Sequence, residues 1–336
     1  GTTHPALIRE QLDRAWQADA RRIWVVNVGD IKPAEYLTQY FLDLAFDRAA
    51  FSPAPQEHLA RWATVQFGAA AGAEVAAIMT EYYGLAFERR PEFMGFGQVE
   101  PTRPNQTSDY VRTGGEEAER RLDRYGALVA RAERLGATLP AGRQDAFFQL
   151  VLYPVRGAAS INERILALDL AAAHARAAGD PLGDSATGRH AAVPRADMAV
   201  LMERARAAHG RIVDDTAAYN AQAGGKWNGI MHPAPRDLPV FRKPVFPRWT
   251  LPTDGRCAVV AADVAFAGGV PGTRAFTLYS GGRPRDWSLT DLVGATASLR
   301  QGRLDAANGY RQRLTIAYRG GRDVPVGRIA CGGTAI

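Results

Sequence analysis

The feature that most constrains the fold is a short apolar run at residues 23–26, continued by Val28 after one polar residue. A polar cluster of Asn27, Asp30 and Lys32 follows at its carboxyl end. A continuous apolar run of this length is typical of a parallel strand buried on both faces, and active sites of α/β barrels are built where such strands end. Because only residues 1–22 precede the run, we predict that it belongs to the last unit of a TIM-type barrel whose other strands lie upstream. The chain would then be the C-terminal part of a larger enzyme.

The apolar pattern divides the chain into four predicted domains and indicates a multidomain protein that combines α/β, all-α and all-β regions. Residues 1–50 predict the terminal βα unit of the barrel, with helices over 6–20 and 34–46 around the strand. Residues 51–222 predict a helical bundle, because apolar residues recur every three or four positions in the segments 56–66, 70–83, 116–135, 144–178 and 195–223.

The last two predicted domains differ in composition from the bundle. Residues 223–254 are rich in proline and glycine, which forbids long helices and predicts an extended linker or lid. Residues 255–336 predict a β-sandwich, because short alternating runs are separated by glycine-rich turns; the expected strands are 257–260, 273–279, 311–318 and 327–330.

Composition narrows the class of partner. A chain of 336 residues with 46% hydrophobic content can bury a sizeable core, and it holds no apolar run long enough for a transmembrane helix. The formal net charge is +6, but arginines alternate with acidic residues, as in residues 116–121, which is typical of a solvated helix face. We therefore expect neither nucleic acid nor a membrane as a partner, whereas an anionic sugar would suit a basic surface.

The sequence lacks the common motifs for a nucleophilic serine, for nucleotide binding and for metal binding. There is no Gly-x-Ser-x-Gly elbow, no Walker loop and no His-Glu-x-x-His, and the six histidines show no ligand spacing. We predict no cofactor and no metal, and we interpret Phe147, Phe148 and residues 150–153 as core. Cys257 and Cys331 fit no zinc or redox spacing; they pair if they flank adjacent strands of one sheet, or they are two buried free thiols.

Several stretches, taken together and in order, resemble glycoside hydrolase family 115, the xylan α-1,2-glucuronidases. IWVVNVGDIKP at 23–33 and FLDLAFD at 41–47 resemble the end of that family's catalytic barrel. Further resemblance lies in residues 62–68, RRPE at 89–92, DAFFQLVLYPV at 145–155 and GGKWN at 224–228, and in residues 276–287 and 311–332 of the predicted sandwich.

The chain departs from the family in two places. GIMHPAPRD at 229–237 stands where many members have paired methionines and an aromatic-rich stretch. Tyr318 follows Ala317 where an Asp-Trp pair is expected. These departures concern substrate preference more than reaction type.

The resemblance implies an inverting hydrolase that removes (4-O-methyl)glucuronic acid from xylan side chains without a cofactor. Inversion needs an acid and a base carboxyl group about 6.5–9.5 Å apart, and these are expected upstream of Gly1, so the chain alone should be inactive. The implied partners are glucuronoxylan or xylo-oligosaccharides. We also expect a homodimer, because a helical bundle with apolar surface left exposed by the missing barrel would favour association. The implied location is secreted or periplasmic in a bacterium. The alternative is a non-catalytic dimerisation or carbohydrate-binding module.

The end of the predicted strand is the first candidate site. Asn27 and Asp30 are the candidate catalytic residues, since an amide can hold sugar hydroxyls by donating and accepting, and a carboxylate can position water or orient a catalytic partner. The alternatives are a structural hydrogen bond for Asn27 and a helix cap for Asp30. Lys32 either pairs with the glucuronate carboxylate or forms a salt bridge. His4 either lines the pocket or caps the helix that starts at Pro5.

The second candidate site is the Gly-Gly-Lys-Trp-Asn-Gly loop at 224–229. Lys226 and Trp227 would bind substrate there, because they offer a cation beside an aromatic face on which a sugar can stack. The alternative is that this loop only docks the linker against the bundle.

Overall fold

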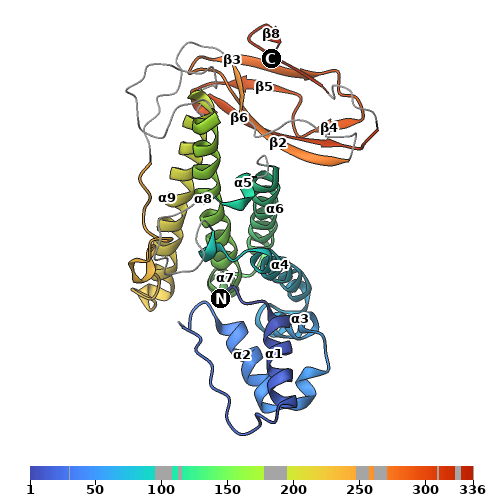
Figure 1. Ribbon diagram of the computed structural model, residues 1–336, viewed down its shortest axis with the longest axis vertical. Helices are drawn as coiled ribbons and strands as arrows, with labels where there is room; N and C mark the ends of the chain where they lie inside the picture. The colour runs from blue at the N-terminus through green and yellow to red at the C-terminus, as the bar shows by residue number, and fades with distance from the viewer. Residues whose placement is uncertain are drawn as a thin grey trace. The chain divides into compact units, whose positions relative to one another are not determined.

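The computed structural model describes residues 1–29, 31–94, 108–112, 116–177, 195–246, 257–260, 271–308, 310–321 and 327–335. The chain forms two compact units, and each is assembled from several stretches (Figure 1). The first comprises Gly1–Pro104, Arg124–Asn162 and His209–Lys243; the second comprises Asn105–Asp123, Glu163–Ala208 and Pro244–Ile336. These units cut across the four predicted domains, whose boundaries stay predictions.

The first unit begins with two helices. Helix α1 spans Pro5–Gln17 and starts at Pro5, whose missing N–H costs nothing in a first turn. Helix α2 spans Glu35–Phe46 and buries one face, formed by Tyr36, Leu37, Tyr40 and Leu44. Both helices were predicted from apolar spacing and are confirmed.

The predicted strand at residues 23–28 is wrong for this chain, because the segment is irregular and belongs to no sheet. Ile23 is 80% exposed and Val25 is 90% exposed, while Trp24 packs against the main core of the first unit. A parallel strand needs neighbouring strands to pair with, and the described part of the first unit contains none. The apolar run indicated a tendency to be buried, but it could not indicate whether a partner is present.

Helices α3 (Pro55–Phe67) and α4 (Ala69–Glu88) form the centre of the first unit, with short 3₁₀ turns at Arg48–Phe51 and Pro91–Phe93. Gly68 joins the two helices in the left-handed region, with φ +86°, where glycine is favoured. Gly72 allows their close approach, since a Cβ there would lie 2.6 Å from the Cα of Thr64.

The remaining helices are α5 (Asp109–Arg112), α6 (Glu116–Thr138), α7 (Ala141–Phe147), α8 (Tyr153–Ala177) and α9 (Arg195–Gly225). A π-helical turn, Phe148–Leu152, joins α7 to α8. This wider turn contains Leu150, whose carbonyl would clash with the ring of Pro154 four residues later in a regular α-helix. The five helical segments predicted between residues 56 and 223 are thereby confirmed over the described residues; residue 178 of the segment 144–178 lies outside them.

The β strands lie in the second unit and form two antiparallel four-stranded sheets. One sheet has the order β1 (Ala258–Val260), β2 (Gly272–Tyr279), β6 (Arg311–Tyr318), β4 (Ala295–Ala297); the other has the order β5 (Gln301–Leu304), β3 (Arg285–Thr290), β7 (Arg328–Cys331), β8 (Thr334–Ala335). Strands β2 and β6 pair along their whole length. Phe276 and Leu314 from one sheet share a core with Trp287 and Leu289 from the other.

Two arginines of β6 connect the strands to helices within the second unit. Arg311 forms an ion pair with Glu203 of α9, and Arg313 forms one with Asp123 of α6. Burial raises the pKa of Asp123, and the Arg313 guanidinium opposes that rise. The ion pair with Arg313 therefore offsets part of the desolvation cost of burying the Asp123 carboxylate between β6 and α6.

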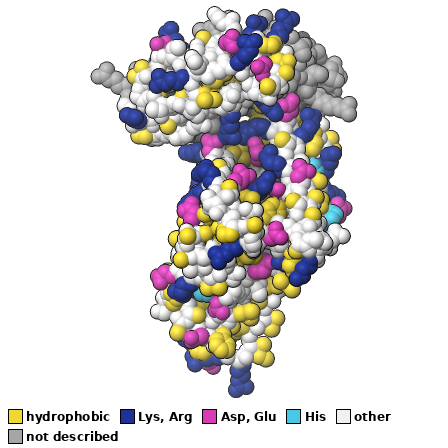
Figure 2. Space-filling model, turned by 180° about the vertical axis from the view of Figure 1, so that it is seen from behind, with side chains coloured by type: hydrophobic (Ala, Val, Ile, Leu, Met, Phe, Trp, Pro, Cys, Tyr) yellow, Lys and Arg dark blue, Asp and Glu magenta, His cyan; other side chains and the backbone are white. Residues whose placement is uncertain are grey.

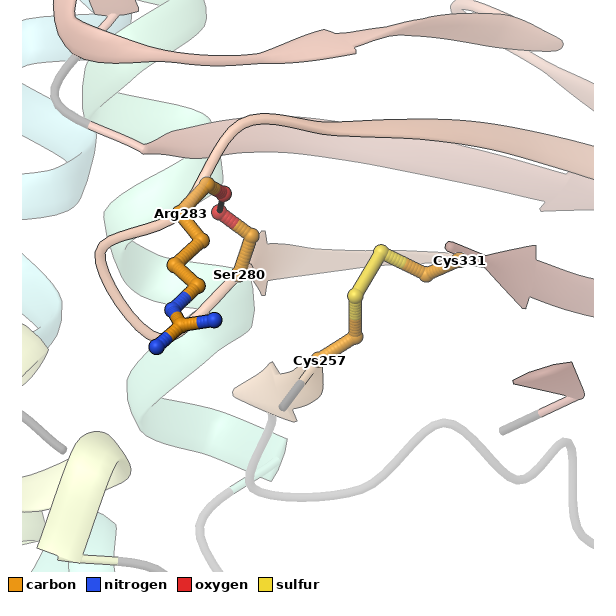
Figure 3. The surroundings of a disulfide bond; sticks show 4 residues. All are labelled: Cys257, Ser280, Arg283 and Cys331. Atoms are coloured by element: carbon orange, nitrogen blue, oxygen red, sulfur yellow. Dashed lines mark hydrogen bonds between the residues drawn. A yellow bond between two sulfur atoms is a disulfide. The ribbon is translucent and has the colours of Figure 1, made fainter. Parts of the chain in front are cut away.

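A disulfide bond joins Cys257 to Cys331, with their Cα atoms 6.1 Å apart (Figure 3). Cys257 lies just before β1 and Cys331 ends β7, so the bond links the two sheets rather than adjacent strands of one sheet. Nearby, the Ser280 hydroxyl donates to the carbonyl of Arg283 at 2.6 Å and closes the turn between β2 and β3 (Figure 3). Of the two alternatives for the cysteines, the structure therefore has the paired one.

Candidate functional site

Lys32 lies at the centre of a polar cluster in the first unit. Its ammonium group donates to Glu35 Oε1 at 2.6 Å and to Gln149 Oε1 at 3.1 Å. The same group lies 4.2 Å from the centroid of a Trp227 ring, a separation at which a cation is attracted to the aromatic face. Lys32, Glu35, Gln149, Gln222 and Trp227 are here called the Lys32 cluster.

Gln149 connects the cluster to the end of α9. Its side chain is buried at 7% exposure, and its Nε2 donates to Gln222 Oε1 at 2.7 Å. The π-helical turn carries this amide within an otherwise apolar run, and a buried amide must be hydrogen-bonded to be tolerated. Sequence reasoning missed Gln149 because the run was interpreted as core; a single Gln among apolar residues was the available signal.

The second candidate site forms a closed loop. The backbone leaves the helical conformation at Gln222, and Ala223, Gly224, Gly225 and Gly229 all have positive φ. The Asn220 side chain closes the loop, since its Nδ2 donates to the Met231 carbonyl at 2.8 Å and its Oδ1 accepts from the Met231 N–H at 3.0 Å. Residues 221–230 are here called the Trp227 loop. Lys226 within it is exposed, with its Nζ 4.8 Å from the Trp227 ring.

Replacing Asn220 with alanine should lower the free energy of unfolding by about 1–3 kcal/mol, because a partly buried backbone N–H and carbonyl of Met231 lose their partners. Urea unfolding of the variant measures this change. Asn228→Ala is the matched control, since Asn228 is an exposed residue of the same loop and its removal should shift stability by less than about 0.5 kcal/mol. Equal stability of both variants would contradict the closing role of Asn220.

Aromatic side chains lie near the cluster, since Tyr219 interacts electrostatically with Glu35. The ring of Tyr219 lies 4.8 Å from that of Tyr153 and 6.4 Å from that of Phe148. The hydroxyl of Tyr219 and Oε2 of Glu35 are both buried without a hydrogen-bond partner. Burial raises the pKa of Tyr219 well above its usual value, and the Glu35 carboxylate adds to the rise. The phenol therefore stays neutral at ordinary pH.

The other predicted site residues take different positions. His4 caps α1, with its Nδ1 accepting from the Ala6 N–H at 3.1 Å, and it also borders a hollow lined in part by Leu59 and Tyr83. Burial lowers the pKa of His4. Asn27 accepts from the Gly29 N–H at 2.9 Å in an exposed turn. Asp30 lies outside the described residues.

The structure thus brings together three predicted residues, Lys32, Lys226 and Trp227, from segments far apart in the chain. The contacts described for His4 and Asn27 include no member of the Lys32 cluster. Among the described ranges, no group of three or more His, Cys, Asp or Glu side chains could hold a metal ion. Within the same ranges, no helix has the length and apolarity needed to cross a membrane.

Comparison with known proteins agrees with the resemblance described for the motifs. Residues 1–93 match the model of glycosyl hydrolase family 115. Among solved structures, the chain matches one described as a novel family GH115 4-O-methyl-α-glucuronidase, BtGH115A, with specificity for decorated arabinogalactans. The match has a TM-score of 0.58 and 23% sequence identity, and it covers 95% of this chain and 47% of that one. No curated protein matches the chain.

This chain therefore spans about half the length of the solved structure it matches. The resemblance to glycosyl hydrolase family 115 is confirmed, by sequence over residues 1–93 and by fold over nearly the whole chain.

Proposed function

We propose that this chain is the C-terminal part of a glycoside hydrolase that releases (4-O-methyl)glucuronic acid from polysaccharide side chains. In this proposal residues 1–50 complete a TIM-type barrel, the helices form the bundle beside it, and residues 255–336 form a β-sandwich. Support comes from the family match over residues 1–93 and from the fold shared with an α-glucuronidase.

The observation that carries the proposal is the apolar segment at residues 23–28. It lies inside the family match, yet Ile23, Val25, Val26 and Val28 are between 40% and 90% exposed. Exposed apolar residues in an irregular segment are expected where a strand of a larger sheet is left without its neighbours. The upstream half of a barrel would bury these side chains and bring Asn27 to the strand end.

The proposed reaction is hydrolysis with inversion, in which an acid protonates the leaving oxygen and a base activates water. We assign both carboxyl groups to the upstream half. This chain would contribute substrate contacts, with Trp227 as a stacking face and Lys226 as the cation nearest to it. Asn27 and Asp30 remain candidates for holding sugar hydroxyls or orienting a catalytic partner.

The test compares this chain with the polypeptide translated from the complete coding sequence. Uronic acid release is measured on glucuronoxylan and on a glucuronic-acid-decorated arabinogalactan, and NMR identifies the first anomer formed. We expect release with inversion by the longer polypeptide and none by this chain alone. Two results would contradict the proposal: activity of this chain, or no release from either polysaccharide by the longer one. A coding sequence that begins at Gly1 would favour the non-catalytic module instead.

The proposed location is outside the cytoplasm, secreted or periplasmic, and the Cys257–Cys331 disulfide supports an oxidising compartment.

We also propose that the chain self-associates as a homodimer, since exposed apolar residues such as Phe46 and Val65 favour association. Analytical ultracentrifugation tests this proposal. Charged side chains of both signs are interspersed with hydrophobic ones on the face seen in Figure 2. The face seen there therefore lacks the basic stripe that nucleic-acid binding would require.

A further inference from the structure

Lys32 holds together three parts of the first unit that are remote in sequence. Glu35 begins α2, Gln149 lies in the π-helical turn, and Trp227 lies in the Trp227 loop. The Lys32 side chain is only 16% exposed, and its ammonium group already has two hydrogen-bond acceptors and an aromatic face. In this arrangement Lys32 is poorly placed to receive the carboxylate of a substrate.

Lys226, unlike Lys32, is placed where a substrate carboxylate could reach its ammonium group. It is exposed, and it lies beside the same indole ring that Lys32 contacts. An aromatic face next to an exposed ammonium group fits an acidic sugar, because the ring can stack on the pyranose while the cation pairs with the carboxylate. Whether Trp227 and Lys226 present this pair together depends on how firmly the Trp227 loop is held.

We propose that Lys32 is a positioning residue, which fixes the Trp227 loop so that Trp227 and Lys226 form one contact for an acidic polysaccharide. This inference rests on the proposed function for its substrate class. Asn220 closes the ends of the loop, and Lys32 holds its middle. Lys32 thereby acts on the substrate through Trp227 and not through its own ammonium group.

The positive charge is essential to this role. Oε2 of Glu35 is buried without a partner, so Lys32 supplies the hydrogen bond described for this carboxylate. An uncharged side chain of similar length, as in Lys32→Met, would leave the carboxylate unpaired and remove the attraction to the ring. Arginine retains both interactions, because its guanidinium binds carboxylates and stacks on aromatic faces. Lys32→Arg should therefore rescue what Lys32→Met loses.

Hydrogen–deuterium exchange of this chain tests the positioning step without any substrate. Backbone N–H groups of Lys226, Asn228 and Ile230 donate to carbonyls within the loop, and peptides covering residues 221–231 report on them. Lys32→Met should speed their exchange about tenfold, the effect of losing a partly buried cation–π contact. Lys32→Arg should stay close to the parent chain. Lys226→Met is the matched control, because it removes an exposed cation from the same ring and should leave exchange nearly unchanged.

Binding is measured separately, as retardation of the chain in native gels that contain glucuronoxylan or a xylan free of uronic acid. Lys32→Met and Trp227→Ala should both weaken retention on glucuronoxylan, Lys32→Arg should retain it, and the uronic-acid-free xylan should retain none of them. Thermal melting of each variant confirms that the first unit is folded.

The outcomes separate the inference from the function on which it rests. Unchanged exchange in a folded Lys32→Met chain overturns the positioning role. Faster exchange with unchanged retention shows that the loop is held but does not contact the polysaccharide, which also overturns it. If exchange responds as expected but neither the parent chain nor any variant is retained by glucuronoxylan, the substrate class fails while the mechanical role of Lys32 is supported.

Discussion

Replacing Tyr40 with alanine should lower the free energy of unfolding of the first unit by about 3–5 kcal/mol, the range for deleting a large buried aromatic side chain. Tyr40 is fully buried. Its ring stacks on that of Tyr36 with centroids 6.0 Å apart, and lies 4.7 Å from the His58 ring. Because Tyr40 lies on the helix that begins at Glu35, its loss should also loosen the Lys32 cluster. Urea unfolding followed by circular dichroism measures the change.

Tyr40→Phe provides the matched control for this prediction. The Tyr40 hydroxyl is buried without a hydrogen-bond partner, so removing it deletes an unsatisfied polar group while the ring remains. The free energy of unfolding should stay the same or rise. A Tyr40→Ala variant within about 1 kcal/mol of the parent chain would show that this face of α2 does not pack as described.

Removing the Cys257–Cys331 disulfide should have the second large effect. The bond closes a loop with a sequence separation of 74 residues, and the chain-entropy account gives about 4 kcal/mol of stabilisation for a loop of that size. The double variant Cys257→Ala, Cys331→Ala should therefore melt at a clearly lower temperature in its β strands, measured by calorimetry. Reductant should lower the melting temperature of the parent chain in the same way and leave the variant unaffected. Equal melting of parent and variant would contradict a stabilising role.

The helices could be predicted from sequence because each one buries a face against others in the same chain. The buried face can be identified from apolar residues at helical spacing, such as Tyr36, Leu37, Tyr40 and Leu44 in α2. The same approach failed at residues 23–28, where the predicted strand is absent, because a strand depends on partners elsewhere and its local pattern says nothing about them. Strand β3 was also missed, although Trp287 and Leu289 alternate inward along it; a run of six residues gives only two inward positions.

The candidate site was predictable in its members but not in its contacts. Lys32 was predicted because it follows the end of the predicted strand, and Trp227 because it offers an aromatic face beside a cation in a glycine-rich loop. Their contact depends on how α9 ends and where the π-helical turn places Gln149, and neither can be read from residue types. The single Gln in an apolar run marked position 149 as unusual, but its partners Lys32 and Gln222 come from distant segments and depend on the fold.

The disulfide also has a consequence for the covalent integrity of the chain. The segment from Cys257 to Cys331 contains strands β1 to β7, and Cys331 is the last residue of β7. A protease that cuts the backbone once anywhere between the two cysteines would produce two polypeptides that remain joined through sulfur. Such nicked protein should run at its full mass in a denaturing gel and separate into two bands only after reduction.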